Sequence, residues 1–106
     1  MSVTNQQKGM EDHYLSQITS ILNRIFRDKK CNIYLFGSRA IGEHVKTSDF
    51  DIAVLSSEDV SREMSLAREM LDLSNIPFTV DLIDLTVTSE EFLRRVEERG
   101  ILLWKN

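Results

Sequence analysis

The apolar run FDIAVLS at residues 50–56 limits what the chain can fold into, because its apolar side chains fall on both faces of a β-strand. Such a strand is typical of a sheet that is covered on both sides. Three more short runs are rich in β-forming residues, and they lie at residues 31–36, 78–85 and 101–104. The sequence therefore predicts a small sheet of about four strands.

Segments with helical periodicity separate these strands. Residues 11–30 and 60–74 carry apolar side chains at three- and four-residue spacing. Residues 88–100 open on a Thr-x-x-Glu capping-box pattern and close on Gly100, a residue type favoured just past a helix end. The order helix, strand, turn, strand, helix, strand, helix, strand predicts an α/β (α+β) fold, with a mixed sheet packed against three to four helices.

Length and charge narrow the class of protein. The chain has 106 residues, so residues 1–106 are predicted to form one domain, with residues 1–10 flexible. Thirteen Lys+Arg against seventeen Asp+Glu give a net charge of −4, which argues against non-specific nucleic-acid binding. The N-terminus has no signal-peptide core, and no run approaches the roughly 20 apolar residues that cross a bilayer. These features predict a cytoplasmic protein, and the single cysteine, Cys31, is predicted to be buried.

A Gly–Ser pair, Gly37 and Ser38, ends the first predicted strand. Glycine permits a tight turn and a close approach of the backbone to a ligand. If the following residues turn helically, free N–H groups and the Ser38 hydroxyl would point at one spot that suits phosphate oxygens. Taken alone, the pair also fits an ordinary turn.

Two aspartates, Asp49 and Asp51, bracket a phenylalanine at the start of the second predicted strand. Residues i and i+2 of a strand project to the same face, so their carboxylates would stand side by side. Carboxylates held together repel unless a proton or a cation lies between them. The alternative interpretation is that Asp49 caps a turn while Asp51 meets solvent.

A third acid lies inside the predicted strand FTVDLIDL. Asp81 has apolar neighbours, and burying a carboxylate without a partner is costly. If this strand pairs with that of Asp49 and Asp51, three carboxylates could converge on one face and bind Mg²⁺ together with phosphate. Asp84 is the alternative third acid, but it has the opposite strand phase and lies nearer the strand end, so Asp81 is favoured.

Gly–Ser, ten residues, Asp-x-Asp and a later acid on a neighbouring strand form a pattern that resembles the minimal nucleotidyltransferases, small members of the DNA polymerase β-like superfamily. The likeness extends from the first predicted helix to the final GILLW. It implies the nucleotidyltransferase fold, with Gly37 and Ser38 holding the β- and γ-phosphates of a nucleoside triphosphate and Arg39 assisting. Many members carry a second arginine where this chain has Ile41, so one phosphate-facing cation remains.

The resemblance also implies a two-metal reaction. Asp49 and Asp51 would bind two Mg²⁺ ions, for which Mn²⁺ can substitute. Asp81 would ligate the metal nearest the acceptor and help to remove its proton. A nucleoside monophosphate, AMP from ATP, would move to an acceptor hydroxyl and pyrophosphate would leave.

The acceptor has no obvious binding domain within these 106 residues. The resemblance implies a separate helical partner of the HEPN class, typically an RNase toxin that the nucleotidyltransferase, as antitoxin, can AMPylate on tyrosine. A homodimer is the weaker expectation. Two alternatives are a catalytically silent nucleotide-binding antitoxin that acts by contact, and a small-molecule nucleotidyltransferase similar to the aminoglycoside-modifying enzymes.

Overall fold

The computed structural model describes residues 4–37, 40 and 49–106. Its secondary structure confirms the predicted order of helices and strands. The elements are α1 (Thr4–Phe26), β1 (Cys31–Phe36), β2 (Phe50–Ser56), α2 (Ser61–Asp72), β3 (Val80–Asp84), the 3-10 helix η2 (Leu85–Val87), α3 (Glu90–Arg99) and β4 (Ile101–Lys105).

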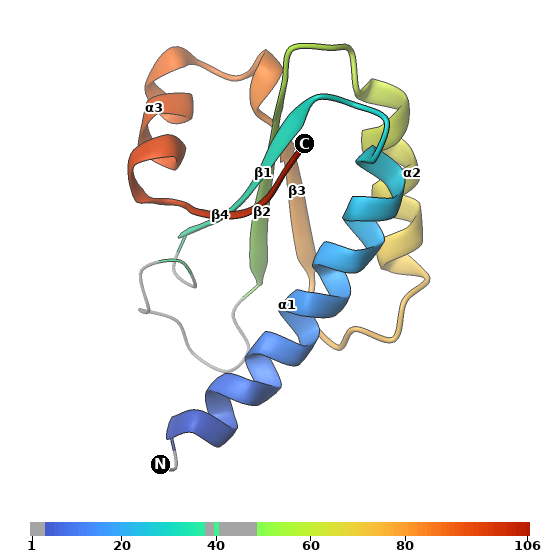
Figure 1. The fold of residues 1–106 in the computed structure, drawn as a ribbon, viewed down its shortest axis with the longest axis vertical. Helices are drawn as coiled ribbons and strands as arrows, with labels where there is room; N and C mark the ends of the chain where they lie inside the picture. The colour runs from blue at the N-terminus through green and yellow to red at the C-terminus, as the bar shows by residue number, and fades with distance from the viewer. Residues whose placement is uncertain (1–3, 38–39, 41–48) are drawn as a thin grey trace.

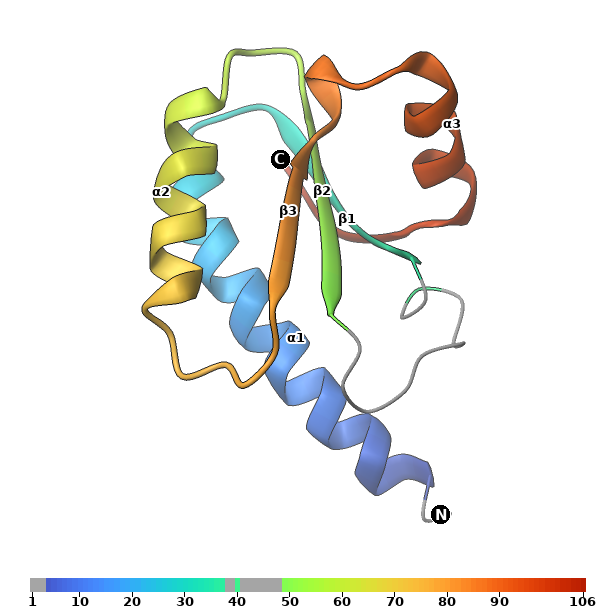
Figure 2. The same cartoon turned by 180° about the vertical axis from the view of Figure 1, so that it is seen from behind.

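The four strands form one mixed sheet in the order β3-β2-β1-β4. Strand β2 runs antiparallel to β1 and parallel to β3, and β4 pairs antiparallel with the other side of β1. Helices α1 and α2 cover one face of the sheet and α3 lies on the other (Figure 1). Seen from behind, β3 forms one edge of the sheet (Figure 2). The central place of β2 explains why its sequence is apolar on both faces.

The larger core lies between the sheet and the helices α1 and α2. Ile18, Leu22 and Phe26 are fully buried at four-residue spacing along α1, as an amphipathic helix on a sheet requires. The smaller core lies under α3, where Val96 is buried and the ring of Phe92 meets that of Phe36 at 5.6 Å, nearly edge to face. The sheet is therefore packed on both faces, but by two helices on one face and one on the other.

The first helix differs from its prediction at both ends. It begins at Thr4 rather than at residue 11, because lengthening an existing helix needs no new nucleation and the stretch includes the helix formers Gln6, Gln7 and Lys8. It ends at Phe26 rather than at residue 30. After Phe26 the chain turns, and the N–H of Lys29 donates to the Phe26 carbonyl at 3.0 Å. Within the described residues, no helix combines the length and the apolarity needed to span a membrane.

The third predicted helix and strand also begin later than predicted. The capping-box interpretation of Thr88 is wrong, because the Thr88 hydroxyl donates to the carbonyl of Leu85 at the end of η2. Ser89 is the N-cap of α3 instead, and its hydroxyl oxygen accepts the N–H of Phe92 at 3.2 Å. Strand β3 begins at Val80 rather than at residue 78, and Phe78 lies before it, packed edge to face with Phe50 and Tyr14.

Cys31 is buried at the start of β1, as predicted, and only 4% of its surface is exposed. Burial, reinforced by the negative charge of Glu58, raises the pKa of its thiol from 9.0 to about 11. Folding therefore favours the protonated thiol. The stability that this group contributes is complete below about pH 9 and is lost as the pH rises toward 11.

We therefore expect the ¹³Cβ chemical shift of Cys31, followed by NMR across a pH series, to titrate with a midpoint near pH 11 in the native protein. In urea-unfolded protein the midpoint should fall near 9.0. A native midpoint equal to the unfolded one would contradict the burial argument.

Candidate active site

One row of residues crosses three strands at the end of the sheet where β1 ends and β2 and β3 begin. Phe36 of β1 is opposite Asp51 of β2, and Asp51 is opposite Asp81 of β3. Residues paired in register project to the same face, and neighbouring strands lie about 4.8 Å apart. The next residue of β2 on that face, Ala53, packs in the core under α3. Asp51 and Asp81 are thus neighbours on the face that α3 partly covers, and the pairing of their strands, which the sequence left as a condition, is present.

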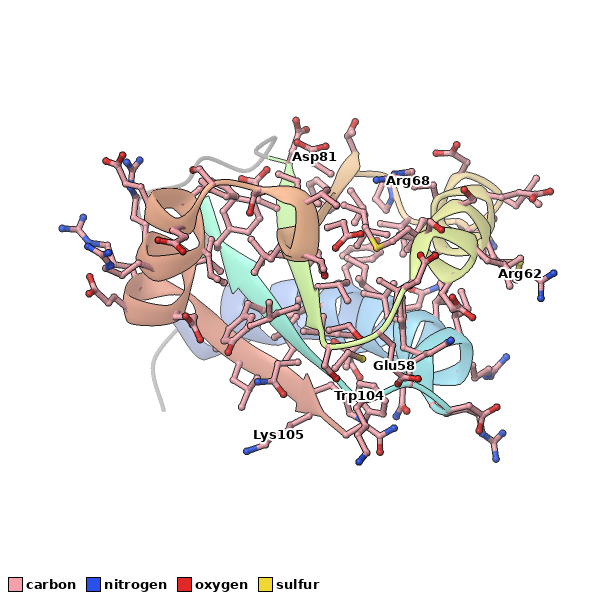
Figure 3. All side chains as sticks on the ribbon, turned by 90° about the horizontal axis from the view of Figure 1, so that it is seen from above. Glu58, Arg62, Arg68, Asp81, Trp104 and Lys105 are labelled. Atoms are coloured by element: carbon pink, nitrogen blue, oxygen red, sulfur yellow. The ribbon has the colours of Figure 1, made fainter. Side chains whose placement is uncertain are left out.

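The two carboxylates differ in their access to solvent. Asp51 is half-buried on the central strand β2, whereas Asp81 is exposed on the edge strand β3. Figure 3 shows Asp81 at the margin of the sheet, away from α3. Two adjacent carboxylates repel at neutral pH unless a cation screens them, and their oxygens are the ligands that hard divalent cations prefer. The pair therefore fits a divalent-metal site that is open on the side of β3.

Asp49 lies just before the paired residues of β2. It is exposed and precedes the first residue of β2. Within the part of the chain that the structure describes, no three His, Cys, Asp or Glu side chains are close enough together to hold a metal ion. The structure therefore brings Asp51 and Asp81 together but does not gather all three predicted acids. The metal-binding role of Asp49 stays a prediction.

Asp84, the alternative third acid, has a local structural role. It is opposite Val54, further along the sheet from the row of Asp51 and Asp81. Its carboxylate accepts the N–H of Thr86 at 2.9 Å and caps η2. This placement favours Asp81 over Asp84 as the neighbour of Asp51.

Gly37 brings the end of β1 close to the carboxylate of Asp51. Its φ of +75° lies in the left-handed region, and its carbonyl accepts the N–H of Ala40 at 3.1 Å in a tight turn. A Cβ at this position would overlap Oδ2 of Asp51 and lie 3.2 Å from its Cγ. The tight turn is therefore present, and the close approach in the structure is to a carboxylate of the candidate site, whereas the predicted approach to a phosphate ligand stays a prediction. Ser38, Arg39 and Ile41 lie outside the described residues, so their predicted roles at the phosphates stay predictions.

Replacing Gly37 with alanine should harm the site more than the fold. The left-handed φ costs a non-glycine residue about 1–2 kcal/mol of unfolding free energy. The new methyl group would also displace Asp51, which should lower nucleotidyl transfer by about 10-fold or more. Urea titration and a transfer assay on the folded protein measure the two effects.

Gly100 provides a matched control for this variant. A Cβ there would lie 2.5 Å from the carbonyl oxygen of Val96 and 3.1 Å from that of Leu35, at a φ of −75°. Gly100→Ala should therefore reduce stability while the folded fraction keeps its transfer rate. Equal loss of transfer in both variants would show that Gly37 acts only through stability.

Arg68 was not assigned a role from the sequence. It lies on α2, and its Nη2 donates to the backbone carbonyl of Leu82 in β3 at 3.0 Å. No sequence motif marks this contact, since it depends on how α2 packs beside β3. Figure 3 places Arg68 on the same side of the molecule as Asp81.

Comparison with known proteins shows which family the chain belongs to. Residues 16–106 match the family model described as polymerase beta, nucleotidyltransferase. The chain belongs to this family of nucleotidyltransferases. The resemblance inferred from the Gly–Ser and Asp-x-Asp pattern is thus confirmed. Nucleotidyltransferases of this family generally use divalent metal ions, in agreement with the paired carboxylates of Asp51 and Asp81.

Similar proteins include one relative of known sequence and two solved complexes. The chain is 34% identical over 90 residues to a probable protein adenylyltransferase MntA of Haemophilus influenzae, covering 81% of this chain and 75% of that protein. A toxin–antitoxin crystal structure with AMP-PNP matches with a TM-score of 0.65 and 32% identity, over 83% of this chain and 73% of that one. A tri-AMPylated Shewanella oneidensis HEPN toxin in complex with MNT antitoxin matches with a TM-score of 0.59 and 28% identity, over 86% and 72%.

Proposed function

We propose that this nucleotidyltransferase moves AMP from ATP to a hydroxyl group of a HEPN-type protein and is the antitoxin of a toxin–antitoxin pair. The observation that carries the proposal is the in-register pair of Asp51 and Asp81 beside the turn at Gly37. The similarity to a probable protein adenylyltransferase and to an AMPylated HEPN complex supports the choice of acceptor.

The carboxylates would hold two Mg²⁺ ions, for which Mn²⁺ can substitute. Asp49 and Asp51 would bind them from the start of β2, and Asp81 from β3. When bound, such ions neutralise the triphosphate and stabilise the attacking and leaving oxygens of an in-line displacement. The chain supplies oxygen ligands of the kind that Mg²⁺ requires.

The turn that starts at Gly37 would bind the β- and γ-phosphates. Its backbone N–H groups and the Ser38 hydroxyl are donors for phosphate oxygens, and Arg39 adds a positive charge. Because Gly37 has no Cβ, the phosphates and the carboxylate of Asp51 can approach the same backbone. Nucleotide binding and metal binding are thereby coupled through one close contact.

The acceptor hydroxyl would enter from the side of β3. Asp81 is exposed there, whereas Asp51 is half-buried beside it on the neighbouring strand. A carboxylate within hydrogen-bond reach of the hydroxyl can take up its proton as the bond to phosphorus forms. The net charge of −4 would favour association with a basic, RNA-binding partner in the cytoplasm.

Co-expression with a HEPN-type protein, to be sought in the reading frame next to that of this chain, tests the proposal. Intact-mass measurement should find one or more added AMP units on that protein. The additions should disappear with Asp51→Ala, because Asp51 stands in the centre of the row. Asp72→Ala is the matched control, since Asp72 is an exposed acid on α2.

Other results would select the alternatives. A tight complex with no added mass, unchanged by Asp51→Ala, would favour an antitoxin that acts by contact alone. A chain that binds no neighbour would point to a small-molecule acceptor instead. In either case protein AMPylation by this chain would be refuted.

A further inference from the structure

Strand β3 is an edge strand, because among the described residues no strand pairs with its outer side. Its inner side pairs with β2 from Val80 to Asp84. On its outer side, the carbonyl of Leu82 accepts the hydrogen bond from Arg68 at 3.0 Å. Edge strands expose backbone groups of this kind and are held less firmly than central strands. Arg68 therefore supplies a contact that a neighbouring strand would otherwise make.

The packing of α2 places Arg68 at this edge. Met64, Ala67 and Leu71 are the buried residues of α2, and Leu82 lies in the same core with 4% of its surface exposed. Arg68 follows Ala67 and reaches past this core to the outer edge of β3. Within the described residues its guanidinium forms no salt bridge with a carboxylate, so the carbonyl is the partner that fixes its direction.

Asp81 is the residue directly before Leu82. Its side chain is exposed on the opposite face of the strand, so little packing on that face fixes its position. The next residue, Leu82, makes two contacts that hold the strand. Its side chain packs in the core with the buried residues of α2, and its carbonyl accepts the hydrogen bond from Arg68. The separation of the Asp51 and Asp81 carboxylates therefore depends on how firmly these contacts hold β3.

We infer that Arg68 is a positioning residue, which holds the outer edge of β3 and thereby fixes Asp81 against Asp51. The inference rests on the proposed function, since it concerns the geometry of the same acid pair. A charge-assisted hydrogen bond from a planar guanidinium restricts direction as well as distance. Misplacing a reacting group by about 1 Å can cost 100-fold in rate, so a small release of β3 is sufficient to matter.

Three variants separate this role from others. Arg68→Ala removes the hydrogen bond, and Arg68→Lys keeps the charge and one shorter donor. Arg62→Ala is the matched control, because Arg62 lies on the same helix and points away from the sheet in Figure 3. Each variant is compared with the wild-type chain at the same folded fraction.

The first measurement is independent of transfer. Amide hydrogen exchange across Val80–Asp84 should be about 10-fold faster in Arg68→Ala and close to wild type in Arg68→Lys and Arg62→Ala. Mn²⁺ titration in the presence of AMP-PNP, followed by paramagnetic broadening of β3 amides, should show weaker Mn²⁺ binding in Arg68→Ala alone. Unchanged exchange and unchanged Mn²⁺ binding would overturn the inference.

The second measurement uses the complex with the HEPN-type partner. Arg68→Ala should lower kcat by about 10-fold to 100-fold with little change in the KM for ATP, and Arg68→Lys should restore part of the loss. A raised KM for the partner with an unchanged kcat would mean that Arg68 binds the acceptor, and the inference would fail. If the wild-type chain transfers nothing, the proposed function fails, but the exchange and Mn²⁺ results still decide the role of Arg68.

Discussion

The Asp51→Asn variant should lose nucleotidyl transfer by about 100-fold to 1000-fold while it keeps the fold. Asp51 occupies the centre of the row between Phe36 and Asp81, so it is the acid that both neighbouring strands help to position. Asparagine has nearly the same shape as aspartate but only one oxygen and no charge. The variant can therefore fill the same space, but it cannot balance the charge of a divalent cation.

Calorimetry with AMP-PNP separates the contribution of the metal from that of the nucleotide. In the wild type, Mg²⁺ should strengthen binding, because Asp51 and Asp81 would hold the cation and its charge would offset that of the phosphates. In Asp51→Asn that strengthening should disappear. Without metal, the variant should bind AMP-PNP at least as tightly as the wild type, because one negative charge near the phosphates has been removed.

The matched control for this experiment is Asp72→Asn. Asp72 is an exposed acid at the end of α2, on the opposite side of the sheet from Asp51, so its replacement should leave the effect of Mg²⁺ unchanged. Identical Mg²⁺ dependence in wild type and Asp51→Asn would exclude Asp51 as a metal ligand. Unfolding curves for all three proteins show whether the fold is kept.

The strands that carry the acids could be predicted because their local sequence and their packing agree. Strands β1 and β2 begin and end where the predicted runs at residues 31–36 and 50–56 do. Their apolar patterns match the burial of a sheet interior, so local preference and tertiary environment favour the same conformation. The pairing of β2 with β3 decides whether Asp51 meets Asp81. The sequence alone left this pairing open, and the structure shows it.

The helix ends were less predictable because several residues compete for each cap. Thr88 and Ser89 are both good N-cap residues, and the sequence alone cannot show that η2 uses the hydroxyl of Thr88. Once Thr88 donates to Leu85, Ser89 is left to cap α3. The start of α1 at Thr4 likewise has no strong local signal, since most of its first residues are polar.

Contacts between distant residues were beyond sequence reasoning. The glycine of the Gly–Ser pair was expected to permit a turn, but its close approach to the Asp51 carboxylate depends on the register of β1 and β2. The hydrogen bond from Arg68 to Leu82 depends on the packing of α2 against β3. Both features place the candidate acids, and neither leaves a spacing pattern in the chain.

A comparison of Asp81→Asn with Asp84→Asn tests the second acid of the site. Asp81→Asn should lower transfer by about 100-fold or more, because Asp81 is the neighbour of Asp51 and the acid nearest the open edge. Asp84→Asn should change transfer by less than about 2-fold. Asparagine can also accept the N–H of Thr86, so the cap of η2 would survive. Rates of AMP incorporation into the HEPN-type partner measure both effects.

Asp84→Ala adds a control, because replacing Asp84 should affect stability more than replacing Asp81, the opposite of the order expected for transfer. It removes the cap of η2 and should lower the unfolding free energy by about 1 kcal/mol, whereas Asp81→Asn should leave stability nearly unchanged. Asp81 and Asp84 have opposite strand phases, so a register error of one residue between β2 and β3 would exchange the faces on which they lie. A larger loss of transfer in Asp84→Asn than in Asp81→Asn would therefore place Asp84 on the face of Asp51 and would refute the row of Phe36, Asp51 and Asp81 from which the site is built.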